Sequence, residues 1–206
     1  MALTDLFEIG DKDSLVRQII QSKNEIDLTT HNTEAPLESF YKDYTIESIV
    51  IDPENHRHDV STKLKKLREI LEINDIELGV QTAAYEAVLN AYEHGNKFDH
   101  TKEILIGYQL NPNSFKFFVE DSGGILKPEF ASYIMNFRVQ NNERIKFKSF
   151  YDFSDETPNT EQNQGVGTFF MHQYMDKINY FKGSTGGLIV EMTKNLEKDK
   201  NLELNK

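Results

Sequence analysis

The stretch EAVLNAYEHG, residues 86–95, decides how this sequence is interpreted. It ends an apolar run that predicts a buried helix, yet Glu86, Asn90 and His94 recur every four residues and so share one side of that helix. A carboxylate and an amide that are buried without partners each cost on the order of a few kcal/mol. Two interpretations stay open: a solvated polar stripe on a packed helix, or a site that binds a hard cation or takes a proton from water or a hydroxyl.

The bulk composition fits a single globular domain with a small appendage. Of the 206 residues, 38% are hydrophobic and 28% charged, and the absence of cysteine excludes disulfides and Cys-based zinc sites. The net charge of −11 argues against direct binding to nucleic acid or to an anionic membrane. No stretch approaches the ~20 apolar residues of a membrane span, and residues 1–14 lack the features of a secretion signal, so we expect a cytoplasmic protein.

The composition changes along the chain and predicts three regions. Residues 1–42 are expected to be an appendage, with a short amphipathic helix near residues 15–20 followed by a polar linker. A domain is predicted over residues 43–196, and residues 197–206 are expected to be a solvated tail. Residues 122 to about 164 form a long polar connection with one internal helix, and a connection of this length within a domain is usually functional.

Hydrophobic periodicity predicts a two-layer α+β domain. The predicted elements in order are a strand at 44–52, helices at 58–72 and 75–95, strands at 103–110 and 114–121, a helix after 165, and strands at 178–181 and 187–194. Asp75 is expected to cap the start of the second helix and Gly95 to end it. Because strands follow one another without an intervening helix, we expect a mixed, mostly antiparallel sheet with helices on one face.

A second stretch, FVEDSGG (118–124), places Asp121 at the end of a predicted strand. A carboxylate there can accept a hydrogen bond from a ligand's amino group, and Gly123 and Gly124 would let a flat ring approach the backbone. A plain turn is the simpler alternative. A strand of an aspartic protease is another, but it requires a second such aspartate or a dimer, and it leaves Glu86 unexplained.

A third stretch, NQGVGTFF (163–170), puts Gly165 and Gly167 just before a predicted helix. The free N–H groups and positive dipole end of a helix start suit a phosphate. A pair of glycines at this spacing is a weak signal by itself, and neither a Walker loop nor G-x-G-x-x-G is present.

Taken in order, the three stretches resemble the GHKL (histidine-kinase-like) ATPase domain, and are most similar to the bacterial anti-sigma-factor serine/threonine kinases. Residues 86–95 match E-x-x-x-N-A-x-x-H-G, residues 119–123 match V-x-D-x-G, and residues 165–167 match a G-x-G that precedes a helix containing M-D-K-I (175–178). The resemblance covers roughly residues 44–195. It implies a Bergerat-type ATP-binding fold, which is a two-layer α/β sandwich with helices on one face of the sheet.

The resemblance also implies roles for individual residues. Glu86 would be the general base that acts on a protein hydroxyl or on water, and Asn90 would coordinate the Mg²⁺ that bridges the ATP phosphates. Asp121 would accept a hydrogen bond from the adenine amino group, with Gly123 beside the ring. His94 would be a contact at the helix end or with the lid.

At the third stretch, Gly165, Gly167 and the Thr168 hydroxyl would meet the phosphates, and residues 125–164 would form the lid over the nucleotide. The sequence departs from the family pattern at Ile125, where a further glycine is usual. This departure bears on catalysis and partner identity more than on nucleotide binding.

The function that the resemblance implies is that of an ATP- and Mg²⁺-dependent serine/threonine protein kinase that phosphorylates an anti-sigma-antagonist protein and sequesters a sigma factor. A nucleotide-gated protein-binding switch without phosphoryl transfer is the alternative function. Whether the chain forms a homodimer is left open by the sequence. A sensor histidine kinase fragment with His58 as phosphoacceptor is disfavoured, because only about one helix separates His58 from the Glu86 helix.

Overall fold

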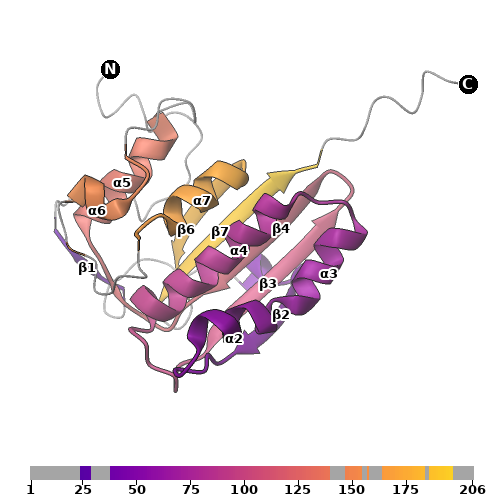
Figure 1. Ribbon diagram of the computed structural model, residues 1–206, viewed down its shortest axis with the longest axis horizontal. Helices are drawn as coiled ribbons and strands as arrows, with labels where there is room; N and C mark the ends of the chain where they lie inside the picture. Colours follow the sequence, from indigo (N-terminus) through magenta and orange to yellow (C-terminus); the bar gives the residue numbers. More distant parts are fainter. Residues whose placement is uncertain are drawn as a thin grey trace, which may run out of the picture.

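The predicted α+β class is confirmed by the computed structural model, which describes residues 24–28, 38–139, 147–154, 157, 164–183 and 186–196. Five strands form the main sheet in the order β2-β3-β4-β7-β6, and helices cross one face of it (Figure 1). The strands are β2 (Thr45–Ile49), β3 (Ile104–Asn111), β4 (Ser114–Glu120), β6 (Lys177–Lys182) and β7 (Leu188–Asn195). All four pairings are antiparallel, so this sheet is less mixed than predicted.

Both predicted hairpins form. Asn111 lies opposite Ser114 in the β3–β4 pairing, which leaves a two-residue turn between the strands. In the second hairpin, β7 lies between β6 and β4, with Ile189 of β7 opposite Glu120 at the end of β4. This register brings the residue that follows β4, Asp121, next to the start of β7.

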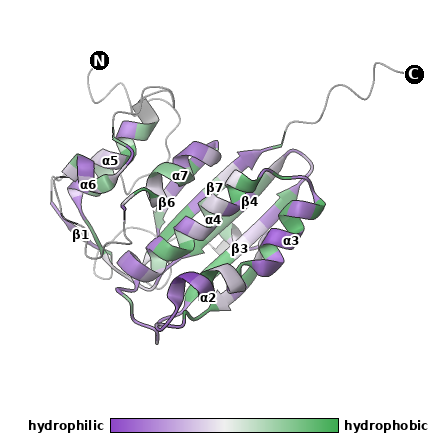
Figure 2. Cartoon of the chain, in the orientation of Figure 1, coloured by the Kyte–Doolittle hydropathy of each residue, from purple (hydrophilic) through white to green (hydrophobic). Residues whose placement is uncertain are grey.

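The helices bury their apolar sides against the sheet. Those over the sheet in Figure 1 are α2 (His56–Lys63), α3 (Lys65–Ile73), α4 (Leu78–Asn90) and α7 (Gly167–Tyr174), while α5 (Pro128–Val139) and α6 (Phe150–Ser154) lie together at one end. Phe115, Phe117 and Val119 of β4 are buried in one core with Val80 and Val88 of α4. Figure 2 shows hydrophobic residues along the central strands and a mostly hydrophilic α2. The central helix α4 is therefore held between the sheet and its neighbours.

The helix predicted over 58–72 is divided in two, because the chain turns at Leu64. Thr62 Oγ1 donates a hydrogen bond to the carbonyl of His58 (3.1 Å), and the Arg68 guanidinium donates to the carbonyl of Ser61 (3.3 Å). Side chains that bond to helix carbonyls compete with the backbone pattern and bend helices. The helical segment was predicted correctly, but its continuity was not.

Asp75 does not begin the second helix, contrary to prediction. It has a φ of 53°, and α4 starts at Leu78. The N–H of Asp75 donates to the carbonyl of Glu72 (3.2 Å), and the N–H of Ile76 donates to that of Leu71 (2.9 Å). This pair of bonds is a Schellman motif, in which a left-handed residue ends a helix. Asp75 therefore terminates α3.

The end of the central helix widens into a π turn at Ala91–Gly95. The N–H of Asn96 donates to the carbonyl of Ala91 (2.7 Å), five residues earlier, instead of the usual four. π turns in α-helices occur frequently at functional sites. This one carries the His94 and Gly95 that the sequence singled out.

Two described parts of the N-terminal region contact the domain. β1 (Ile26–Asp27) pairs with β5 (Ile125–Leu126), which follows β4 in the chain. The ring of Phe40, the last residue of the 3₁₀ helix η2 (Glu38–Phe40), and the ring of Tyr44 contact Phe118, which points to the sheet face opposite the helices. The helix predicted near residues 15–20 and the predicted tail, 197–206, lie outside the described residues.

Candidate functional site

A cavity of about 810 Å³ lies between α4, α7 and the end of β4. This volume is in the usual range for small-molecule and cofactor sites, roughly 300–1,000 Å³. The residues that line it include Glu86, Asn90, Asp121, Gly165, Gly167 and Thr168, all singled out by the sequence. Three segments far apart in the sequence therefore meet at one cavity, although the roles predicted for their side chains stay predictions.

Gly123 is buried but does not line the cavity. Its N–H donates to Asp121 Oδ1 (3.0 Å), while the next residue, Gly124, forms part of the cavity wall. His94, on the π turn, is exposed and also lines the cavity. Of the two glycines in the second stretch, Gly123 thus holds Asp121 and Gly124 shapes the cavity wall.

Glu86 and Asn90 lie side by side on α4 and face the start of α7. A Cβ built on Gly167 would lie 2.6 Å from Glu86 Oε2 and 3.4 Å from Asn90 Oδ1, so α7 can approach this closely only with glycine there. Asn90 Nδ2 donates to the sulfur of Met171 (3.5 Å). Because the nitrogen of the Asn90 side chain is turned to that sulfur, its oxygen is the atom available as a ligand for a hard cation.

Burial raises the pKa of Glu86 above its ordinary value. The nearby Arg57 guanidinium lowers this pKa, and the Glu93 carboxylate raises it. Glu93 is itself buried, at 3.4 Å from the Arg57 guanidinium and 3.3 Å from His56 Nε2. A half-buried carboxylate with a raised pKa is a better proton acceptor than a solvated one, and so suits a general base.

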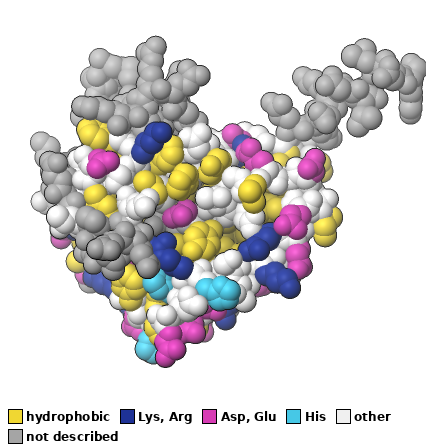
Figure 3. Space-filling model, in the orientation of Figure 1, with side chains coloured by type: hydrophobic (Ala, Val, Ile, Leu, Met, Phe, Trp, Pro, Cys, Tyr) yellow, Lys and Arg dark blue, Asp and Glu magenta, His cyan; other side chains and the backbone are white. Residues whose placement is uncertain are grey.

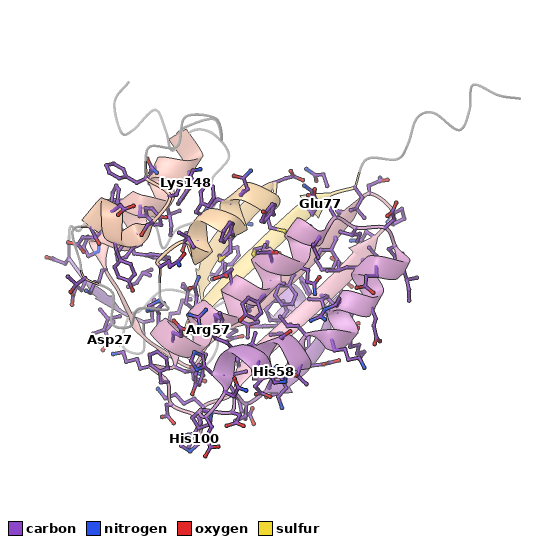
Figure 4. The ribbon with its side chains drawn as sticks, in the orientation of Figure 1. Asp27, Arg57, His58, Glu77, His100 and Lys148 are labelled. Carbon is purple, nitrogen blue, oxygen red and sulfur yellow. The ribbon has the colours of Figure 1, made fainter. Side chains whose placement is uncertain are left out.

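Arg57, Glu93 and Asn96 were missed by sequence reasoning. Arg57 and Glu93 line the cavity, and Figure 4 shows Arg57 near the end of α4. Asn96 is fully buried; its Oδ1 accepts from the N–H of Ser122 (2.9 Å), and its Nδ2 donates to the carbonyl of Lys102 (3.2 Å). Asn96 thus ties the end of α4 to the turn after Asp121, and its position directly after the E-x-x-x-N-A-x-x-H-G stretch was the available signal.

Asp121 is a buried carboxylate held by the backbone. It is 5% exposed, and its Oδ1 accepts from the N–H groups of Gly123 and Leu188, both at 3.0 Å. Burial raises the pKa of Asp121 to about 7, against the opposing effect of these two donors. A Cβ on Gly95 would collide with the Asp121 carboxylate, which explains the glycine at the end of the helix.

The third stretch is attached to α6. Gly165 has a φ of 65°, and a Cβ there would lie 2.6 Å from the ring of Tyr151. The N–H of Phe150 donates to the carbonyl of Gly165 (2.8 Å), and Ser149 Oγ donates to that of Gln164 (2.8 Å). The start of α7, where phosphates are expected, is therefore fixed from the lid side as well as from α4.

The side chains present suit a cation shared with phosphates better than a metal enclosed by protein. Within the described residues, no group of three or more His, Asp or Glu side chains could hold a metal. Mg²⁺ is commonly bound by one or two protein oxygens together with substrate phosphates and water. The oxygen of Asn90 beside the start of α7 fits that arrangement.

Two further observations concern the surface charge and the lengths of the helices. On the face shown in Figure 3, acidic and basic side chains of the described residues are interspersed and form no broad basic patch. No helix in the described part of the chain has the length and apolar character needed to cross a membrane.

Comparison with known proteins assigns the family. A search of curated proteins found no match. The family model of the histidine kinase-like ATPase domain matches residues 52–194, well over half of the chain and a range that includes α4, β4, α7 and most of the residues that line the cavity. Together with the antiparallel sheet and its helical layer, this match shows that the chain belongs to the histidine kinase-like ATPase family.

Proposed function

We propose that the protein is an ATP-dependent serine/threonine kinase of the anti-sigma-factor type, which phosphorylates an anti-sigma-antagonist protein and sequesters a sigma factor. Membership of the histidine kinase-like ATPase family indicates ATP binding. The observation that carries the proposal further is the meeting of Glu86, Asn90, Asp121 and Gly167 at one cavity. The match of residues 86–95 to the motif of the anti-sigma kinases supports the narrower assignment.

The cavity wall offers separate contacts for the two ends of a nucleotide. The Asp121 carboxylate would accept from the adenine amino group at the end of β4. Asn90 Oδ1 would bind Mg²⁺, while the N–H groups at Gly167 and Thr168 would donate to phosphate oxygens at the start of α7. When bound, Mg·ATP supplies the phosphoryl group and part of the charge neutralisation.

Glu86 would take the proton from the hydroxyl of the acceptor serine or threonine. Its position one helical turn before Asn90 would put the base next to the metal ligand, where the phosphoryl group would be transferred. The raised pKa of Glu86, caused by burial, makes it a stronger proton acceptor once it is ionised. Arg57 opposes this effect and keeps the ionised form accessible.

The test is transfer of radiolabelled γ-phosphate from ATP to a purified anti-sigma-antagonist protein. We expect labelled antagonist with the natural protein and at least a hundredfold less with Glu86→Gln, since general bases contribute about 10²–10⁴-fold. Glu69→Gln, an exposed carboxylate on α3, is the matched control and should label normally. Equal labelling by the Glu86→Gln protein would show that another group acts as the base.

The second candidate function is a nucleotide-gated switch that binds a partner protein without phosphoryl transfer. The packing of the lid supports this candidate. A separate aromatic cluster joins α5, α6 and α7; it contains Tyr133, Phe137 and Phe169, with Phe130, Phe147, Phe150, Phe153 and Phe170 against them. Because α6 is also bonded to Gly165, a ligand at the start of α7 would act on the whole cluster. Unlabelled antagonist that nevertheless binds in an ATP-dependent manner would favour this switch.

A further inference from the structure

Residues 24–28, here called the strap, lie against the wall of the cavity. Asp27 pairs with Ile125 of β5 in antiparallel register. The N–H of Leu28 donates to the carbonyl of Gly124 (3.2 Å), which is itself a cavity residue. Figure 1 shows β1 at the left edge of the molecule, and Asp27 is labelled there in Figure 4. The N-terminal region is therefore attached to the segment that directly follows Asp121.

The strap contributes side chains to the cavity and to the core. Leu28 is 2% exposed and belongs to the main hydrophobic core together with Leu126. Glu25 and Leu28 both line the cavity. The strap lies outside residues 52–194, which match the family model, so it is an addition to the part of the chain that defines the family.

We propose that the strap is a wall of the nucleotide cavity that opens and closes at the base-binding end, with Leu28 as its anchor. This inference rests on the proposed function, because it takes the ligand to be an adenine nucleotide. The strap touches Gly124, and a Cβ on Gly124 would lie 3.6 Å from the Cα of Gly95, beside the buried Asp121 carboxylate. Its place is therefore next to the group expected to bind adenine.

The pairing is short enough to open while the domain stays folded. β1 and β5 contain two residues each, and the pair is separate from the five-stranded sheet. A two-stranded pairing is at best marginally stable by itself, and such elements open at a small fraction of the global free energy. Opening would remove Leu28 and Glu25 from the wall and leave a path for nucleotide release. The N-terminal region would thereby control how long a nucleotide stays bound.

A disulfide tests whether the strap must open. The chain has no cysteine, so Asp27→Cys with Ile125→Cys creates the only thiol pair. Both side chains are exposed, and residues opposite each other in an antiparallel pair have Cα atoms about 4.5–5.5 Å apart, within reach of a disulfide. The measurement is the rate at which Mg·mant-ATP, a fluorescent analogue, leaves when chased with unlabelled ATP, before and after oxidation of the same protein.

We expect the oxidised protein to release the analogue at about one tenth of the reduced protein's rate, or more slowly still. The reason is that minor open states are typically populated at the per-cent level, and the disulfide prevents them from forming. The reduced protein should behave like the natural chain. Leu28→Ala, which shortens the anchor, should speed release. A matched pair on the β3–β4 hairpin, Asn111→Cys with Ser114→Cys, lies opposite in register away from the cavity and should leave the rate unchanged on oxidation.

The outcomes separate the two proposals. Binding with equal release rates in the oxidised and reduced states would overturn the role of the strap and leave nucleotide binding intact. Failure of the cysteine pair to form a disulfide would also overturn it. If the analogue binds in neither state, the proposed function fails, and the inference fails with it.

Discussion

The Cα of Gly167 at the start of α7 lies directly against the carboxylate of Glu86 on α4, since a Cβ at this position would stand 2.6 Å from Glu86 Oε2. Asn90 Oδ1 would be 3.4 Å from the same Cβ. The glycine that opens α7, the helix predicted to bind the phosphates, is therefore also the surface against which the predicted base and metal ligand pack.

The first prediction follows from this contact. Gly167→Ala should push Glu86 and Asn90 out of place and weaken Mg·ATP binding at least about tenfold, equivalent to about 1.4 kcal/mol. The control is Glu69→Ala on α3, an exposed side chain that does not line the cavity. Titration calorimetry on both variants measures the difference, and equal affinities would contradict the close packing.

The second prediction concerns the pH dependence of phosphoryl transfer. A base acts in its ionised form, so the rate should rise with pH through the raised pKa of Glu86. Arg57→Gln removes a charge that lowers this pKa and should move the rise to higher pH; Glu93→Gln removes a charge that raises it and should move the rise to lower pH.

The control for these two variants is Lys65→Gln, an exposed cation on α3 that should leave the profile in place. The measurement is the single-turnover rate of transfer across the pH range. If the pH profile moved in the same direction for Arg57→Gln and Glu93→Gln, the two charges would not act on the pKa of Glu86 in opposite directions.

The third prediction concerns the stability of the nucleotide-free protein. Asp121 has a pKa of about 7 in the folded chain and an ordinary value of 3.8, so between these pH values the folded state holds a proton that the unfolded state has lost. Its contribution to the free energy of unfolding is therefore full below about pH 4 and falls as the pH rises to about 7, by up to about 4 kcal/mol.

Asp121→Asn should remove this slope, because an amide oxygen can accept the same two backbone N–H groups without titrating. Chemical denaturation of both proteins from pH 4 to 8 measures the difference between their slopes. Parallel curves would mean that the Asp121 carboxyl is ionised throughout.

The sequence was sufficient for features that depend on local pattern. Alternating residues defined the hairpin of β3 and β4, and the short connection between them fixed its register. The helical spacing of Glu86, Asn90 and His94 placed all three on the side of the helix that faces the cavity. These predictions were correct because each depends on neighbours in the chain.

Features that depend on distant contacts were missed. Asp75 resembles a helix cap, but the burial of Leu71 and Ile76 in one core favours the turn that ends α3. The pairing of β1 with β5 joins segments about a hundred residues apart, and two-residue strands carry no detectable periodicity. The ion pair of Arg57 with Glu93 likewise exists only once α2 packs beside α4.

The fourth prediction tests the reassignment of Asp75. Because its φ is positive, Asp75→Val should lower the free energy of unfolding by roughly 1–2 kcal/mol, while Asp75→Gly should keep or raise it. If Asp75 were an N-cap, its replacement by glycine would instead lower the free energy of unfolding by about a few tenths of a kcal/mol. Urea denaturation of the two variants distinguishes the helix end from the cap.

Isothermal titration of Mg·ATP into the nucleotide-free protein is the most direct measure of whether the three segments form one nucleotide site. We expect saturable heat with one nucleotide per chain, weakened by Gly167→Ala and retained by Glu69→Ala. The absence of heat with the natural chain, under conditions where it is folded, would contradict the assignment of the cavity as an ATP site.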